Sequence, residues 1–403
     1  MENSSLKVLK NKRIILGITG SIAAYKAVEL TRRLTEAGAA VDVILTEAAK
    51  RFITPLTFSS ITKGRVYTDL FEEPLSHIRV AEEAVLLVIA PATADIIGKI
   101  ANGIADDMLT TVCMAFKGKV MIAPAMNWRM FENEALQRNL RNLQSREVIQ
   151  VGPERGALAC GEINTGRMAD IDDILDEIEI ALTEKDLLGR RIMVTAGPTR
   201  EYIDPVRFIS NRSSGKMGYA IAEVASRRGA EVILISGPSS LIPPKRVSLV
   251  PVETTSEMRD AVLSRLKGSD ILIMAAAPAD FSPEARSPEK IDSRKGLQLS
   301  LRRTPDILKE VSSHDDRPFV IGFAAETGEN IGRARQKLRE KGLDMIIFND
   351  VTSPGAGFEL DTNKVTIIGR GQEVSLPIMT KEDLAGLILD RVSDLLRGGI
   401  PQG

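Results

Sequence analysis

The sequence is constrained most by a pattern of strand, turn, helix and strand that occurs twice along the chain. In the first copy, the apolar run RIILGITGS ends in a turn, and apolar residues then recur at helical spacing from Ala23 to Leu34. Gly38 ends that helix, and AVDVILT follows as the next strand. In the second copy, the strand RRIMVTAG is followed by a helix, by Gly229 and by the strand EVILISGP. Each copy is a βαβ unit, which predicts parallel α/β sheets.

Chain length and a charged segment between the two copies predict two domains. A chain of 403 residues is too long for one ordinary domain. The segment TEKDLLG is charged and lacks an apolar period, which is typical of a linker. We therefore expect two Rossmann-like domains with parallel sheets, at residues 1–185 and 186–403. Ligand sites in such domains lie where the strands reach their carboxyl ends.

Composition excludes several classes of function. The formal net charge of -1 argues against binding to nucleic acid through phosphate neutralisation. Two cysteines and two histidines are too few for a disulfide framework or a histidine-rich metal site. The polar start MENSSLKVLKNKR is not a signal peptide, and no apolar run reaches the roughly 18 residues of a membrane helix. We expect a cytoplasmic protein that binds neither nucleic acid nor membrane.

Several segments of the first half contain candidate ligand-binding residues. In GITGSIAAYK, Gly20 and Ser21 form a strand-to-helix turn whose free N–H groups and hydroxyl suit a phosphate. The turn is not GxGxxG, so the dinucleotide fingerprint is absent. Thr46 and Thr93 end later strands, at the same predicted edge of the sheet. Cys160 lies in the glycine-rich stretch GALACGEINTGR, where it is either a reactive loop thiol or an inert small side chain.

Taken together, motifs along the whole chain resemble a known family. GSIAAYK, SHI, PATADIIGKIANGIADDMLTT, PAMNWRMFEN and GALACGEINTGR occur in order in the first half. They are similar to the homo-oligomeric flavin-containing cysteine decarboxylases, which implies a flavodoxin-like fold for this half. In the second half, DPVRFISNRSSGKMG, AAAPADF, EKI, GFAAET and FND resemble the phosphopantothenate–cysteine ligases. Their order in one chain is similar to the bifunctional proteins of coenzyme A biosynthesis.

For the first half, the resemblance implies FMN-dependent decarboxylation of phosphopantothenoylcysteine to 4'-phosphopantetheine. Oxidation of the cysteinyl thiol to a thioaldehyde places an electron sink beside the carboxylate, so loss of CO2 gives an enethiolate that an acid must protonate. His77, Asn127 and Cys160 match the family's catalytic positions. Cys160 is expected to be the acid, Asn127 to hold the substrate carboxylate, and His77 to position substrate or to assist proton transfer from the thiol. The residues expected to contact FMN are Gly20, Ser21, Thr46 and Thr93. The family commonly has asparagine where this chain has Asp95.

For the second half, the resemblance implies that CTP and Mg²⁺ activate 4'-phosphopantothenate as an acyl-cytidylate, which the amine of L-cysteine then attacks. Asn211 matches the asparagine of the acyl-cytidylate step, and Lys290 in EKI matches a lysine that neutralises departing phosphate. Asp280 is expected to bind the ribose or Mg²⁺. The family continues Lys-x-Lys-Lys at this lysine, whereas this chain reads KIDSRKG, with Lys295 as a candidate replacement. The other expected CTP contacts are Ala275, Ala276, Ala277, Thr304, Pro305, Asp306, Ile307, Phe323, Lys337 and Lys341.

Two other functions fit parts of the pattern. Pyridine-nucleotide dehydrogenases also contain doubly wound domains, but the missing GxGxxG turns weigh against that class. A flavoprotein regulatory subunit is a non-catalytic alternative, against which Asn127 and Cys160 weigh. The family's decarboxylase units form trimers and its ligase units form dimers, so the resemblance implies a homo-oligomer, expected to be a dodecamer.

Overall fold

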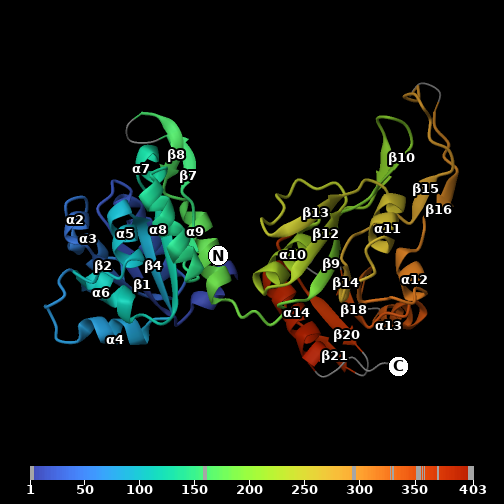
Figure 1. Cartoon of the computed structure of the whole chain (residues 1–403). Coiled ribbons are helices and arrows are strands. Elements are labelled where there is room, and N and C mark those ends of the chain that lie inside the picture. Colours follow the sequence, from blue (N-terminus) through green and yellow to red (C-terminus); the bar gives the residue numbers. More distant parts are fainter. Residues whose placement is uncertain are drawn as a thin grey trace. The chain divides into compact units, whose positions relative to one another are not determined.

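The chain divides into two compact parts, called unit 1 (residues 1–183) and unit 2 (residues 184–403). The structure is a computed structural model that describes residues 4–157, 161–292, 296–326, 328, 331–350, 355, 357, 359–369 and 372–397 (Figure 1). Cys160 and Lys295 lie outside the described residues. Within those described ranges, no helix combines the length and the apolar character needed to cross a membrane.

Unit 1 is built on a six-stranded parallel sheet with the strand order β3-β2-β1-β4-β5-β6. The strands are β1 (Arg13–Ile18), β2 (Ala40–Leu45), β3 (Val66–Tyr67), β4 (Leu86–Ala92), β5 (Lys119–Pro124) and β6 (Ile149–Gln150). Without the short edge strand β3, this is the order of flavodoxin, and the strand order reverses between β1 and β4. A ligand of such a sheet binds at the carboxyl ends of these two strands.

Alternate side chains of β1 belong to two different hydrophobic cores, because successive residues of a strand face opposite sides of the sheet. Ile14 and Leu16 pack with α1 (Ala24–Glu36) and α9 (Ile171–Leu182), whereas Ile15 belongs to the core on the other face. The helices of the other face are α4 (Ser76–Glu83), α5 (Ala94–Ala101), α6 (Met108–Ala115) and α8 (Glu134–Ser145). Shorter elements of unit 1 are the 3₁₀ helix η1 (Ser4–Leu9), α2 (Glu47–Lys50), α3 (Pro55–Ser59), α7 (Trp128–Phe131) and the hairpin of β7 (Glu154–Ala157) with β8 (Ile163–Arg167).

Unit 2 contains an eight-stranded sheet with the order β13-β12-β9-β14-β17-β18-β20-β21. Its first six strands in this order are parallel, as in the dinucleotide-binding fold. They are β9 (Arg191–Ala196), β12 (Glu231–Ser236), β13 (Val247–Pro251), β14 (Ile271–Met274), β17 (Phe319–Glu326) and β18 (Met345–Asp350). The last two strands of the sheet are the antiparallel pair β20 (Val365–Gly369) and β21 (Gln372–Ser375).

Helices cover both faces of this sheet. On one face lie α10 (Lys216–Arg227) and α14 (Lys381–Arg397). The other face is covered by α11 (Thr255–Leu263), α12 (Ile307–Ser312) and α13 (Ile331–Glu340). Thr380 caps α14, since its hydroxyl accepts a hydrogen bond from the Asp383 N–H at 3.1 Å.

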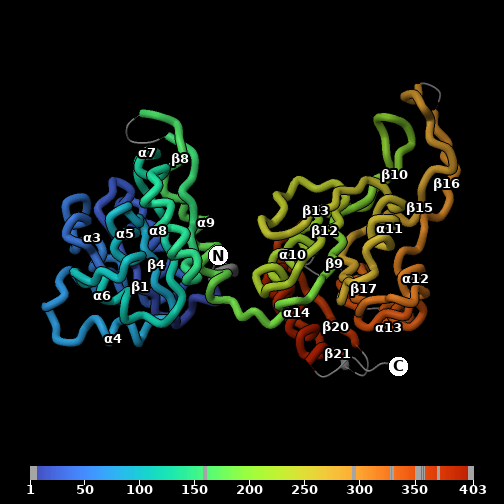
Figure 2. Tube along the Cα trace, viewed as in Figure 1, coloured from blue at the N-terminus to red at the C-terminus, as the bar shows by residue number. Residues whose placement is uncertain are grey.

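Two short antiparallel pairs extend from the sheet of unit 2. One pair is β10 (Arg200–Tyr202) with β11 (Phe208–Ser210), and the other is β15 (Phe281–Pro283) with β16 (Leu301–Arg303). Figure 2 shows β10 and β15 side by side. A further small pair, β19 (Thr362–Asn363) with β22 (Met379–Thr380), precedes α14.

Part of the segment predicted as a linker belongs to the core of unit 2. Leu187 is fully buried there. The Asp186 carboxylate accepts hydrogen bonds from the Arg228 guanidinium at 2.9 and 2.5 Å, and these bonds lower the pKa of Asp186. Arg228 also donates to Asp390 in α14, at 2.7 Å. The two adjacent leucines of this charged run show neither a helical nor a strand period, so the sequence pattern did not indicate that Leu187 is buried.

Candidate functional site

A threonine hydroxyl joins the two strand ends at the reversal point of unit 1. Thr19 follows β1, donates to the Pro91 carbonyl of β4 at 2.7 Å and accepts from the Thr93 N–H at 3.1 Å. Thr93 precedes the first residue of α5, but its side chain makes no capping hydrogen bond to that helix. The first N–H groups of α5 therefore point at the sheet edge without a side-chain partner from Thr93, which is the arrangement that binds phosphates.

The turn after β1 packs against the helix that follows β2. A Cβ atom at Gly20 would lie 2.5 Å from the Ala48 Cβ, so only glycine fits this approach. Thr46 caps α2 by accepting from the Ala49 N–H at 3.3 Å, and the Ser21 hydroxyl accepts from the Ala23 N–H at 3.3 Å. The predicted residues Gly20, Ser21, Thr46 and Thr93 thus all follow strands β1, β2 and β4 at one edge of the sheet.

Asp95 lies in the first turn of α5 but is directed into an ion pair. Its carboxylate is 3.5 Å from the Lys99 Nζ, which also lies 3.1 Å from Asp106. These two carboxylates, Asp106 first, raise the pKa of Lys99. Lys99 therefore offsets the negative charge that an aspartate adds beside a phosphate site.

The hairpin of β7 and β8 is anchored beside Asn127. Asn127 follows β5 and caps α7, with its Oδ1 accepting from the Arg129 N–H at 2.9 Å. The Met126 N–H donates to the Gly166 carbonyl of β8 at 3.0 Å, and a Cβ at Gly166 would lie 2.3 Å from the Met126 carbonyl oxygen. Trp128 donates through its Nε1 to Glu162. The hairpin whose connection contains Cys160 is therefore fixed at the end of β5, although Cys160 itself is not described.

His77 is not brought to this place within one chain. It lies in the first turn of α4, which Figure 1 shows at the end of unit 1 away from α7 and β8. Among the described residues, its buried Nδ1 has no hydrogen-bond partner. The residues around it include three exposed apolar side chains, Phe71, Leu75 and Ile78.

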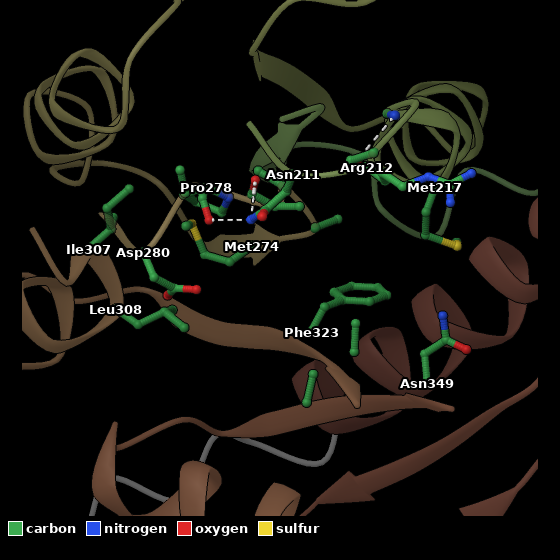
Figure 3. Close-up of a pocket in the computed structure, with 18 of the residues that line it drawn as sticks. Asn211, Arg212, Met217, Met274, Pro278, Asp280, Ile307, Leu308, Phe323 and Asn349 are labelled. Carbon is green, nitrogen blue, oxygen red and sulfur yellow. Dashed lines mark hydrogen bonds between the residues drawn. The ribbon is translucent and has the colours of Figure 1, made fainter. Parts of the chain in front are cut away.

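The predicted ligase residues of unit 2 surround one cavity of about 740 Å³. Its lining comes from the loop before α10, the end of β14, the segment before α12, the end of β17 and the lysines of α13 (Figure 3). The lining includes each predicted contact except Lys290, namely Asn211, Ala275, Ala276, Ala277, Asp280, Thr304, Pro305, Asp306, Ile307, Phe323, Lys337 and Lys341. Lys290 is exposed and lies between β15 and β16, outside the lining.

Asn211 is hydrogen-bonded to the segment that follows β14. Its Nδ2 donates to the Pro278 carbonyl at 2.9 Å and to the Ala277 carbonyl at 3.3 Å. The N–H groups of Ala276 and Ala277 already donate to the Thr195 hydroxyl and the Gly197 carbonyl. A base edge at this segment can therefore meet carbonyl acceptors rather than N–H donors.

Two lysines in and just after α13 supply positive charge to one end of the cavity. Lys337 donates to the Phe323 carbonyl at 3.4 Å, and Lys341 lies 3.1 Å from the Asp306 carboxylate. Burial and then the charge of Lys341 lower the pKa of Lys337. Thr304 closes the neighbouring wall by donating to the Ala279 carbonyl at 2.7 Å. In the described part of the chain, no three His, Cys, Asp or Glu side chains gather into a metal site.

Sequence reasoning missed several polar residues that line the cavity, among them two asparagines and a lysine. Asn349 is the next-to-last residue of β18, Asn363 lies in β19, and Lys381 is the first residue of α14. The motif FND drew attention to the segment of Asn349, but nothing in the local sequence indicated that its side chain faces a cavity. Lys381 follows the helix cap Thr380 and reads as an ordinary exposed helix residue, whereas it is 6% exposed.

Comparisons with known proteins agree along the whole chain. The sequence model of the family "Flavoprotein" matches residues 2–183, and that of "DNA/pantothenate metabolism flavoprotein C-terminal domain" matches residues 187–396. The chain is 47% identical over 398 residues to the coenzyme A biosynthesis bifunctional protein CoaBC of Bacillus subtilis (strain 168), covering 96% of this chain and 98% of that protein.

Solved structures are similar to each half. The C-terminal domain of a coenzyme A biosynthesis bifunctional protein CoaBC is 43% identical, with a TM-score of 0.47, and the match covers 53% of this chain and 100% of that domain. The FMN binding protein AtHal3 is 31% identical, with a TM-score of 0.39, and the match covers 42% of this chain and 96% of that protein.

Proposed function

The chain belongs to the family of coenzyme A biosynthesis bifunctional proteins, and from this premise we propose how its two units divide the work. The protein is an enzyme with two activities, a ligase that produces phosphopantothenoylcysteine and a decarboxylase that consumes it. We assign the decarboxylase to unit 1 (predicted at residues 1–185) and the ligase to unit 2 (predicted at residues 186–403).

The cavity of unit 2 is the observation that carries the ligase assignment. It gathers an amide, a run of carbonyl acceptors and two lysines from segments that are far apart in the sequence. Lys337 and Lys341 suit the phosphates of a nucleoside triphosphate. The carbonyl groups of the Ala275–Ala277 segment suit the amino group of a cytosine, which is a donor. We therefore propose CTP as the nucleotide.

Asn211 is proposed to act at the acyl-cytidylate. Its Nδ2 is oriented by the Ala277 and Pro278 carbonyls, so its Oδ1 is the group that can meet the amine of the attacking L-cysteine. Positioning the amine against the activated carboxylate lowers the barrier by removing freedom that the two reactants have in solution.

We propose that Mg²⁺ enters the cavity together with CTP. Asp280 is a single carboxylate, and Mg²⁺ is commonly bound by one or two carboxylates together with substrate phosphates and waters. The triphosphate would then supply most of the ligands, with Asp280 as the protein's contribution.

The edge of the unit 1 sheet fits FMN. The close approach at Gly20 and the uncapped first turn of α5 form a cradle for its phosphate, with Ser21, Thr46 and Thr93 around it. Bound FMN would accept and return the two electrons that make oxidation of the substrate thiol reversible. The protein's own residues would hold the substrate: the Asn127 amide donates to its carboxylate, and the Cys160 thiol supplies the proton to the carbon left by CO2.

A homo-oligomer is proposed because the decarboxylase site is incomplete within one chain. His77 lies at the other end of unit 1 from Asn127, beside the exposed apolar side chains of Phe71 and Leu75. A second copy that covers this apolar surface would bring its own His77 to the substrate. We propose the dodecamer of decarboxylase trimers and ligase dimers, in the cytoplasm where CTP and free cysteine are available.

Nucleotide-dependent release of pyrophosphate tests the ligase assignment. With 4'-phosphopantothenate and L-cysteine present, the purified protein should release pyrophosphate from CTP in the presence of Mg²⁺, and release should need both substrates for turnover. Equal or faster release from ATP would contradict the proposed nucleotide.

A further inference from the structure

The cavity of unit 2 has a second end that the nucleotide contacts leave unassigned. In Figure 3, Asp280, Ile307 and Leu308 lie on one side of Phe323, and Asn349 lies on the other. Asn349, Asn363 and Lys381 line this second end together with Lys216, the first residue of α10.

Asn349 is a buried acceptor that points into the cavity. Its side chain is 8% exposed. Among the residues that the structure describes, no donor reaches its Oδ1. β18 fixes the position of its backbone, because Asn349 pairs with Ala325 of β17 on one side and with Val365 of β20 on the other. A buried carbonyl oxygen of this kind is normally satisfied, so its partner is expected from a ligand that enters the cavity.

Positive charge lies at the same end. Lys381 is 6% exposed and occupies the first turn of α14, where the helix dipole disfavours a cation. Its Nζ donates to the carbonyls of Gly357 and Leu360. Lys216 lies 2.6 Å from Asp361, and the two lysines are close enough for their charges to interact. A cation retained at such a position suits an anionic ligand.

We propose that Asn349 is a specificity-determining residue of the ligase, whose Oδ1 accepts a hydrogen bond from the amide N–H or the hydroxyl of 4'-phosphopantothenate. The neutral middle of this acid then lies against Asn349, its phosphate faces Lys381 and Lys216, and its carboxylate extends past Phe323 toward Asn211. The inference rests on the ligase function proposed above and adds the position of the acid substrate.

Calorimetric titrations of the full-length protein test the inference with three ligands: 4'-phosphopantothenate, pantothenate without its phosphate, and CTP. Asn349→Leu removes the acceptor at nearly constant size. This substitution should raise the Kd of both acids by the same factor, about 10- to 100-fold, and leave the Kd of CTP unchanged. Lys381→Met should raise the Kd of 4'-phosphopantothenate and leave the Kd of pantothenate unchanged, because the lysine is proposed to contact only the phosphate.

Lys341→Met is the matched control at the other end of the cavity. It should raise the Kd of CTP and leave the Kd of both acids unchanged. If Asn349→Leu unfolds the protein in thermal melts, Asn349→Asp keeps the shape and adds a negative charge that should repel the phosphorylated acid. Unchanged binding of the acids by a folded Asn349 variant, or an equal loss of CTP, would overturn the inference. If the parent protein binds CTP but not 4'-phosphopantothenate, the inference also fails; if it binds neither, the ligase proposal itself fails.

Discussion

Burial of Lys337 affects nucleotide binding through the charge of its amine. Burial and Lys341 lower the pKa of Lys337 from its ordinary value, while Glu326, Asp280 and Asp306 act in the opposite direction. Only the ammonium form attracts a triphosphate. As the pH rises from 7 through the lowered pKa, Lys337 of the free protein loses this charge. The affinity for CTP should therefore begin to fall at a lower pH than it would if Lys337 had the pKa of an exposed lysine.

Two substitutions separate this effect from general damage. Lys337→Met should raise the Kd of CTP by about 10- to 100-fold at pH 7. This factor corresponds to the loss of a hydrogen bond to a charged group. Lys337→Arg keeps the charge at every accessible pH, so its CTP affinity should lose the dependence on pH. A steep fall in CTP affinity above pH 7 that persists in Lys337→Arg would show that another group is responsible.

Cys160 can be tested as the acid of the decarboxylase. Cys160→Ser replaces the thiol by a hydroxyl of far higher pKa, which is a poor proton donor near neutrality. The variant should release CO2 from phosphopantothenoylcysteine in a single turnover and then stop without forming phosphopantetheine. Steady production of phosphopantetheine at the parent rate would mean that Cys160 only packs.

At the scale of secondary-structure elements, Gly218 allows α10 to pack directly on β9. A Cβ at this position would lie 2.8 Å from the Thr195 carbonyl oxygen and 2.6 Å from the Ala196 Cβ. Alanine favours a helix over glycine by up to about 1 kcal/mol, but the backbone of a central strand cannot move aside. Gly218→Ala should therefore destabilise unit 2 by about 1–3 kcal/mol.

Gly386 in α14 provides a matched control for this substitution. A Cβ there meets no atom within 4 Å, so Gly386→Ala should stabilise unit 2 by about 0.5–1 kcal/mol through helix propensity alone. Thermal unfolding of both variants measures the difference. Equal shifts in the same direction would show that the contact at Thr195 does not limit the packing of α10.

Periodic elements of the fold could be predicted from the sequence, and short irregular ones could not. The strands and helices of the two βαβ patterns, the helix Ile171–Leu182 and the hairpin of β20 and β21 follow from apolar period and turn residues. The pairs β10–β11 and β15–β16 contain only three residues per strand, so their pairing depends on tertiary contacts that a local pattern does not carry.

The same reasoning applies to the candidate site. The edge at which Thr93 lies could be predicted because parallel sheets bring their carboxyl ends together, whereas Asn127 and Ala277 were singled out through the resemblance of their motifs to a known family. Asn349 and Lys381 could not, because their burial and the side to which they face depend on how β18 and α14 pack.

At the scale of the whole molecule, the beginning of unit 2 determines which fragments are stable. A fragment of residues 184–403 keeps Leu187 in its core and the ion pair of Asp186 with Arg228. It should fold without flavin and form phosphopantothenoylcysteine. A fragment that begins at Arg191 loses the apolar burial of Leu187 and the ion pair of Arg228 with Asp186, so it should be less stable by about 2–5 kcal/mol. Equal denaturation midpoints for the two fragments would show that residues 184–190 are only a linker.

The assignment of one activity to each unit is tested most directly by two variants of the full-length protein. Each is given 4'-phosphopantothenate, L-cysteine and CTP, or preformed phosphopantothenoylcysteine, while pyrophosphate and CO2 are measured. Lys337→Met should release little pyrophosphate but should still release CO2 from preformed phosphopantothenoylcysteine at the parent rate. Asn127→Leu should release pyrophosphate at the parent rate but should not release CO2 from either mixture. If either folded variant loses both activities, or neither activity, the division of the two reactions between unit 2 and unit 1 is wrong.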